Sequence, residues 1–225
     1  MERIEDSLLL ESNLSGLVTN IGGVATFPAV LPINQSLRWT LQTAAHEWLH
    51  HYLFFRPLGQ QIFSNGEMQT LNETVADLAG REISDRVMAL LEEPIGSISQ
   101  TCTELHQDEI PYKNDDPSFS FNQEMHETRL NVDKLLSEGK IAEAENYMDE
   151  RRSFFNQNGF NIRKINQAYF AFLGTYAENP ASVSPIGPQV KKFRQLTPSL
   201  ETFIKEIGSV SEYSQFIEKL NQLKK

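Results

Sequence analysis

Residues 44–55 constrain the fold of this chain more than any other segment. They read AAHEWLHHYLFF, so apolar residues surround histidines and a glutamate. The helical pattern begins after Ser36, a typical N-cap, and stops at Pro57. Imidazole and carboxylate groups on a buried helix are costly unless they are paired or hold a ligand. The helix therefore needs a metal ion or polar partners from elsewhere in the chain.

Within this stretch, residues 46–50 form the pattern His-Glu-x-x-His. His46 and His50 lie one helical turn apart on the same face, so both imidazoles can bind one divalent ion. Glu47 follows the first histidine, which places its carboxylate near the metal without making it a ligand. That is the position of a general base. Zinc lowers the pKa of a bound water from 15.7 to about 7, so a glutamate can take its proton at neutral pH.

A catalytic zinc site needs a third protein ligand and one open position. The downstream segment LNETVADLAG, residues 71–80, offers Glu73 and Asp77 at i, i+4 on a predicted helix. One carboxylate can complete the metal shell while the other holds a ligand histidine in orientation. Thr70 and Glu73 also form a capping-box pattern, in which Glu73 would only bind the backbone at the start of a helix. Gly80 is explained if two helices pack closely.

These residues resemble the thermolysin-like metallopeptidases, the gluzincins, over residues 36–90. In that family His-Glu-x-x-His is followed by Asn-Glu-x-x-x-Asp, which residues 72–77 match. The resemblance implies zinc as the cofactor and a peptide as the substrate. It implies these roles: zinc ligands His46, His50 and Glu73, general base Glu47, histidine partner Asp77, and Asn72, the first residue of the second motif, beside the ligands.

A second, weaker resemblance concerns INQAYFAFLGTYAENPA, residues 165–181, which is similar to the C-terminal part of bacterial aminopeptidases that carry the same zinc helix. A peptidase also needs a donor for the oxyanion of its tetrahedral intermediate. Tyr169 and Tyr176 are candidates, and core packing with the hydroxyl at the rim explains them equally well. His126 and Arg163 are further alternatives.

The predicted fold is mainly α (α+β): a zincin-like pair of active-site helices, a small N-terminal β element and a helical C-terminal region. Residues 16–32 predict a strand, a turn and an edge strand over 23–30, which either pairs with an extended substrate or packs under the active-site helix. Helices are expected over 2–12, 36–55, 71–91, 123–137, 141–157, 162–177, 188–195, 198–207 and 211–223. The expected regions are a catalytic region over 1–100, an exposed loop over 101–122, and a helical region over 123–225 that packs with the first as one domain.

Composition excludes several classes of function. A net charge of −10 disfavours binding to nucleic acid, which needs clustered basic residues. We expect no membrane-spanning segment, because no apolar run approaches about 18 residues. The single cysteine, Cys102, cannot form an internal disulfide, so a cytoplasmic location is favoured.

Two functions follow from the sequence. The first is a zinc metallopeptidase of the gluzincin type, with an aminopeptidase as one form of it. The second is a non-catalytic protein that keeps the helix for zinc binding or for interaction with a partner. The intact Glu47 separates them, because a purely structural zinc site has no need of a general base.

Overall fold

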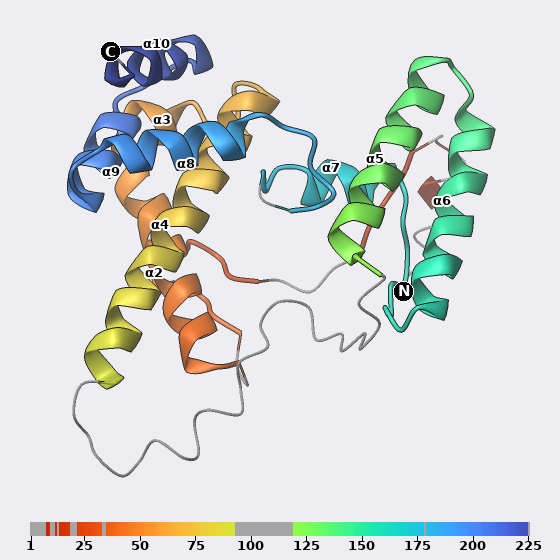
Figure 1. The fold of residues 1–225 in the computed structure, drawn as a ribbon, viewed down its shortest axis with the longest axis horizontal. Helices are drawn as coiled ribbons and strands as arrows, with labels where there is room; N and C mark the ends of the chain where they lie inside the picture. The colour runs from red at the N-terminus through yellow and green to blue at the C-terminus, as the bar shows by residue number, and fades with distance from the viewer. Residues whose placement is uncertain are drawn as a thin grey trace. The chain divides into compact units, whose positions relative to one another are not determined.

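The computed structural model describes residues 8–9, 12, 14–18, 22–32, 35–92, 119–177 and 179–224. Most of the expected helix over 2–12 and of the expected loop over 101–122 lies outside these residues. The described part is mainly helical, as predicted (Figure 1). Its helices are α2 (Leu37–Phe54), α3 (Pro57–Gln60), α4 (Gly66–Glu92), α5 (Phe121–Ser137), α6 (Ile141–Gln157), α7 (Gln167–Leu173), α8 (Ile186–Leu196), α9 (Leu200–Gly208) and α10 (Tyr213–Leu223).

The chain forms two compact units, and each is built from two separate stretches. Unit 1 contains Met1–Asn20 and Tyr112–Ser184, whereas unit 2 contains Ile21–Pro111 and Pro185–Lys225. The units cross the boundaries expected from the sequence, because the stretch 123–225 is divided between them. None of the helices in the described part is both long and apolar enough to span a membrane.

Unit 1 is centred on the helical hairpin of α5 and α6. Gly139 and Gly159 end these two helices with φ values of 74° and 87°, the left-handed conformation that glycine adopts readily. Phe155 is fully buried and contacts the rings of Phe119, Phe121 and Phe160. The unit therefore has a core of its own, made largely of aromatic side chains.

Helix α7 of unit 1 is shorter than the helix predicted over 162–177. Asn166 has an extended backbone, and its side-chain oxygen accepts a hydrogen bond from Tyr169 N at 2.9 Å, which caps the helix. The same side chain donates to Gly16 O at 2.8 Å. One asparagine thus begins the helix and holds the N-terminal segment, and Gly174 ends the helix.

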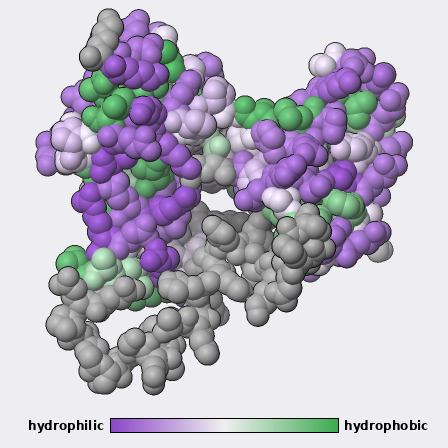
Figure 2. Space-filling view, viewed as in Figure 1, coloured by the Kyte–Doolittle hydropathy of each residue, from purple (hydrophilic) through white to green (hydrophobic). Residues whose placement is uncertain are grey.

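Unit 2 is built around α2 and α4, which pack along each other (Figure 1). Helices α8, α9 and α10 from the C-terminal stretch also contact α4. The visible face of each unit is mostly hydrophilic, with smaller hydrophobic areas (Figure 2). Buried residues of α2 and α4 such as Leu49, Leu53 and Val75 form the apolar interior of this unit.

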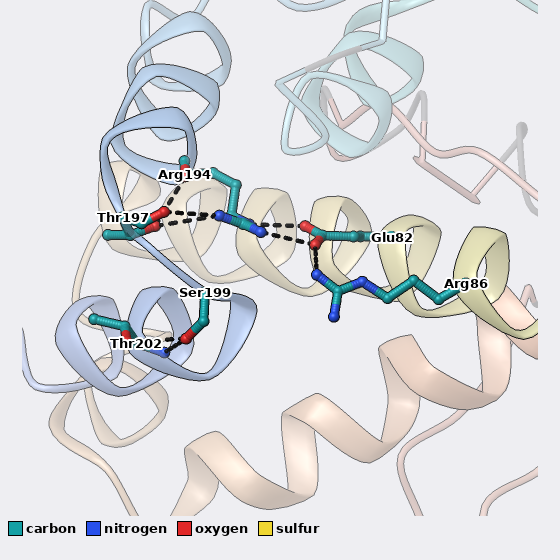
Figure 3. A network of polar contacts seen from close by, with 6 residues as sticks. All are labelled: Glu82, Arg86, Arg194, Thr197, Ser199 and Thr202. Atoms are coloured by element: carbon teal, nitrogen blue, oxygen red, sulfur yellow. Dashed lines mark hydrogen bonds and ion pairs between the residues drawn. The ribbon is translucent and has the colours of Figure 1, made fainter.

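An ion-pair network joins the C-terminal stretch to α4 (Figure 3). Arg194 of α8 donates from Nε and Nη2 to the two carboxylate oxygens of Glu82 of α4, both at 2.8 Å. Arg86 approaches the same carboxylate. The hydrogen bonds from Arg194 lower the pKa of Glu82. The bidentate pair fixes where α8 lies along α4.

The β element is smaller than predicted. Val24 and Val30 form one antiparallel bridge, with a 3.0 Å hydrogen bond in each direction, and no sheet occurs in the described residues. The expected edge strand over 23–30 is a turn instead. Pro28 lacks an N–H group for a ladder, and its carbonyl accepts a hydrogen bond from Thr26 Oγ1 at 2.8 Å.

Candidate metal centre

Helix α2 supplies the two histidines of the candidate site. It begins as predicted, because Ser36 Oγ accepts a hydrogen bond from Trp39 N at 3.1 Å. Leu49 and Leu53 are fully buried. The side chains of His46 and His50, which lie beside this apolar stripe, are only 12% and 16% exposed. Because the helix packs through this apolar stripe, both imidazoles are largely shielded from solvent.

Helix α4 supplies the carboxylate, and a glycine lets it come close. A Cβ atom at Gly80 would lie 2.8 Å from Gln42 O and 3.2 Å from His46 N. Such distances are shorter than an ordinary van der Waals contact, so any side chain at position 80 would push the helices apart. The close packing expected from Gly80 is confirmed. It brings Glu73 to the histidines.

Three donor atoms converge between the two helices. His46 Nε2 and His50 Nε2 lie 3.0 Å apart, and Glu73 Oε2 lies 3.4 Å from the first and 3.6 Å from the second. Ligand atoms about 2.0–2.2 Å from a tetrahedral zinc ion are separated by roughly 3.3–3.6 Å. The two nitrogen–oxygen distances fall in this range, whereas the two imidazole nitrogens are closer together. The three residues form a group that could hold a metal ion.

The charges of this cluster reinforce one another. Burial alone would raise the pKa of Glu73, but hydrogen bonds from His46 and His50, together with their charges, lower it to about 2. Burial opposes protonation of His50, yet the carboxylate of Glu73 raises the pKa of that imidazole. Glu73 is therefore ionised at neutral pH, as a metal ligand must be.

Glu47 lies beside the cluster and is 6% exposed. Burial raises the pKa of its carboxyl group, and the neighbouring histidines offset part of that rise. The carboxylate borders on the segment before α2, since a Cβ atom at Gly23 would lie 2.3 Å from Glu47 Oε1 and 2.8 Å from Thr43 Cγ2. Nothing in the sequence beyond the Gly22-Gly23 pair signalled this contact.

The capping-box explanation of Glu73 is wrong for this structure. Helix α4 begins at Gly66, one turn before Thr70, and Asn65 Oδ1 accepts a hydrogen bond from Met68 N at 2.9 Å. Thr70 lies inside the helix, where its carbonyl accepts from Thr74 Oγ1 at 2.6 Å. Glu73 is thus free to point at the histidines.

The two residues expected beside the ligands have different surroundings. Asn72 is 1% exposed, donates to Leu58 O at 3.4 Å, and raises the pKa of the His50 imidazole through its side chain. Asp77 was expected to bind a histidine. Among the described residues it instead accepts from Gln42 at 3.3 Å and pairs with Arg81 at 3.1 Å. Asn72 is therefore a neighbour of the candidate cluster, and Asp77 connects α4 to α2.

The proposed oxyanion donors belong to unit 1, whereas the histidine cluster belongs to unit 2. Tyr169 packs edge-on against Phe170, and burial raises the pKa of its hydroxyl to about 12. Tyr176 packs against Phe172 in the same way. These surroundings agree with the core-packing explanation of both tyrosines. His126 is exposed on α5, and Arg163 donates to Val18 O.

His51 follows His50 on α2. Its Nε2 atom is buried and has no hydrogen-bond partner in the described part of the chain.

No protein-family model, curated protein or solved structure shows a significant match to this chain.

Proposed function

We propose that this chain is a zinc-dependent peptidase of the gluzincin type. The observation that supports the proposal most strongly is the convergence of His46, His50 and Glu73, whose donor atoms lie within 4.8 Å of one another. The sequence pattern that resembles gluzincins contains the same three residues in the same roles. Glu47, the residue that this resemblance makes the general base, borders on the cluster.

The chemistry divides into what a metal supplies and what the chain supplies. Zinc, when bound, polarises a carbonyl group and lowers the pKa of water. His46, His50 and Glu73 would hold it. Glu47 would take a proton from the attacking water and pass it to the leaving amine. The raised pKa of its carboxyl group suits that task, because a general base works best with a pKa near the working pH.

The number of ligands favours catalysis over a structural role. Structural zinc sites usually have four protein ligands, most often including cysteine. The described residues offer three here, two imidazoles and one carboxylate. A site with three ligands leaves one coordination position for water or substrate, so we favour the peptidase over the non-catalytic zinc protein.

The test compares metal content and peptide hydrolysis in the wild type and in Glu47→Gln. We expect one zinc per chain in both, measured by elemental mass spectrometry. Cleavage of a mixed peptide library should fall by roughly 10²–10⁴-fold in the variant, the usual contribution of a general base. Glu67→Gln, an exposed position in the first turn of α4, is the matched control and should leave both unchanged.

The outcomes separate the two functions. Zinc binding without any cleavage by the wild type would reject the peptidase and leave the non-catalytic zinc protein. A chain that binds no divalent metal would reject both.

The aminopeptidase form of the proposal concerns where the substrate is cut. An aminopeptidase needs the free α-amine of its substrate, so acetylation of that amine should abolish cleavage while an endopeptidase would continue to cut. Mass spectra of the products from paired free and acetylated peptides distinguish the two.

A further inference from the structure

The segment before α2 reaches the candidate general base at one residue. A Cβ atom at Gly23 would lie 2.3 Å from Glu47 Oε1 and 2.9 Å from Glu47 Cδ. Real Cβ atoms do not come so close to other heavy atoms, so a side chain at this position and the present position of the carboxylate exclude each other. Thr43 Cγ2, at 2.8 Å, closes the space on the α2 side.

Gly23 is itself held in place. Val24, the next residue, forms two 3.0 Å backbone hydrogen bonds with Val30. The tip of this turn contributes little to packing, since the side chain of Phe27 is 97% exposed. Gly23 and Leu31, at the two ends of the turn, are half-buried. The bridge therefore holds the backbone next to position 23, and Glu47 is not one of the partners in that bridge.

Backbone conformation does not explain the glycine. Among the described residues, the left-handed glycines are Gly139 and Gly159. Gly23 thus has a φ angle that other residues adopt, and the contact with Glu47 is what a side chain would disturb. Gly22 has an ordinary φ as well, but a Cβ atom there would meet nothing within 4 Å.

We infer that Gly23 is a positioning residue for Glu47: its missing side chain leaves the space that the carboxylate occupies beside the metal ligands. This inference rests on the proposed function for its catalytic consequence. Its structural content, that residue 23 sets the position of the Glu47 carboxylate, does not depend on catalysis. Because the carboxylate is the flexible end of its side chain, Gly23→Ala would displace it with little cost to the fold.

The first experiment measures kinetics in three proteins: wild type, Gly23→Ala and Gly22→Ala. A displacement of about 1 Å from the productive geometry costs up to 10²-fold in rate. We expect kcat for a cleaved peptide to fall by roughly 10–100-fold in Gly23→Ala. KM and zinc affinity should change less than about threefold, because His46, His50 and Glu73 stay in place. Gly22→Ala should match the wild type.

The second experiment needs no activity. The side-chain carboxyl ¹³C resonance of Glu47 is assigned in the full chain as the signal that disappears in Glu47→Gln. We expect this resonance to shift in Gly23→Ala and to stay unchanged in Gly22→Ala. A resonance that does not move in Gly23→Ala would overturn the inference, and so would an active Gly23→Ala variant with the kcat of the wild type. A wild type without peptidase activity would reject the proposed function, while the resonance would still decide the inference.

Discussion

The central helix pairs of the two units differ in whether their buried polar groups find hydrogen-bond partners within the protein. In the α5–α6 pair of unit 1, Arg151 donates to Thr128 Oγ1 at 2.8 Å, pairs with Glu124 and covers the ring of Phe154. In the α2–α4 pair of unit 2, two imidazoles and one carboxylate converge on one point, and the buried Oδ1 atom of Asn72 has no hydrogen-bond partner among the described residues.

The two helix pairs differ in how far their buried polar groups are satisfied within the protein. A buried polar atom without a partner costs about 1–3 kcal/mol, and natural proteins contain few such atoms. The polar contacts of Arg151 are satisfied within the protein. The cluster of α2 and α4 is a group of side chains that could hold a metal ion.

The largest effect is expected from His50→Ala, because it removes one of three ligands. Zinc should raise the melting temperature of the wild type, by an amount that corresponds to about 2.7 kcal/mol when free zinc is 100-fold above its Kd. The variant should show no rise. His126→Ala, an exposed histidine of unit 1, is the control and should keep the full rise in differential scanning calorimetry. Equal zinc stabilisation of His50→Ala and wild type would contradict the metal centre.

The next largest effect tests the other side of the comparison. Phe155 is fully buried in the aromatic core of unit 1, so Phe155→Ala should lower the free energy of unfolding by about 3–5 kcal/mol. Urea denaturation followed by circular dichroism measures this loss. Zinc affinity, measured by isothermal titration calorimetry where both units are folded, should not change. A parallel loss of zinc affinity would show that the two helix pairs are not independent.

Gly80→Ala sharpens the comparison within unit 2. The methyl group would meet the rigid carbonyl of Gln42 at 2.8 Å, and overpacking of this kind costs about 1–3 kcal/mol, against a gain of about 1 kcal/mol in helix propensity. We expect a net loss of stability and weaker zinc binding. Gly66→Ala on the same helix meets nothing within 4 Å and should be neutral or slightly stabilising. Similar stabilities of the two variants would argue against a close contact at Gly80.

The smallest effect concerns the dependence of stability on pH. Arg194 lowers the pKa of Glu82 below its ordinary value of 4.5. The contribution of this carboxylate is therefore complete above pH 4.5 and is lost as the pH falls through the lower pKa of the folded state. Because the pair is partly exposed, we expect about 1 kcal/mol or less. Glu82→Gln should reduce the loss of stability at acid pH more than Glu201→Gln does, because the carboxylate of Glu201 is fully exposed. If the two variants lose stability equally as the pH falls, the Arg194–Glu82 pair does not contribute to stability.

Local patterns in the sequence predicted the parts of the site that lie within single helices. The cap at Ser36 follows from its residue type, and the shared face of His46 and His50 follows from helix geometry. Between helices, the glycine at position 80 predicted the close packing of α2 and α4. The start of α4 was misjudged, because Thr70 and Glu73 form a capping pattern as good as the one that Asn65 completes.

Features that depend on contacts between distant segments could not be predicted. The Gly22-Gly23 pair reads as a turn, and no local rule says which of the two glycines touches Glu47. Asp77 has the spacing of a histidine partner, but Gln42 and Arg81 compete for its carboxylate. The division into two units depends on which helices pair across long stretches of chain, and the composition of residues 123–225 carries no sign of that division.

The discontinuous make-up of the units has a consequence for synthesis on the ribosome. The contacts of α4 with α8, α9 and α10 need residues 185–225, which emerge after all of unit 1 has been made. Unit 1 ends at Ser184 and has all its residues before then, although its two stretches lie on either side of the first stretch of unit 2. The α2–α4 pair must wait, with the apolar surface for those helices uncovered, for the seconds that translation of the C-terminal stretch takes at about 5–20 residues per second. We expect the half-made protein to expose apolar surface at the helices that carry its candidate metal centre.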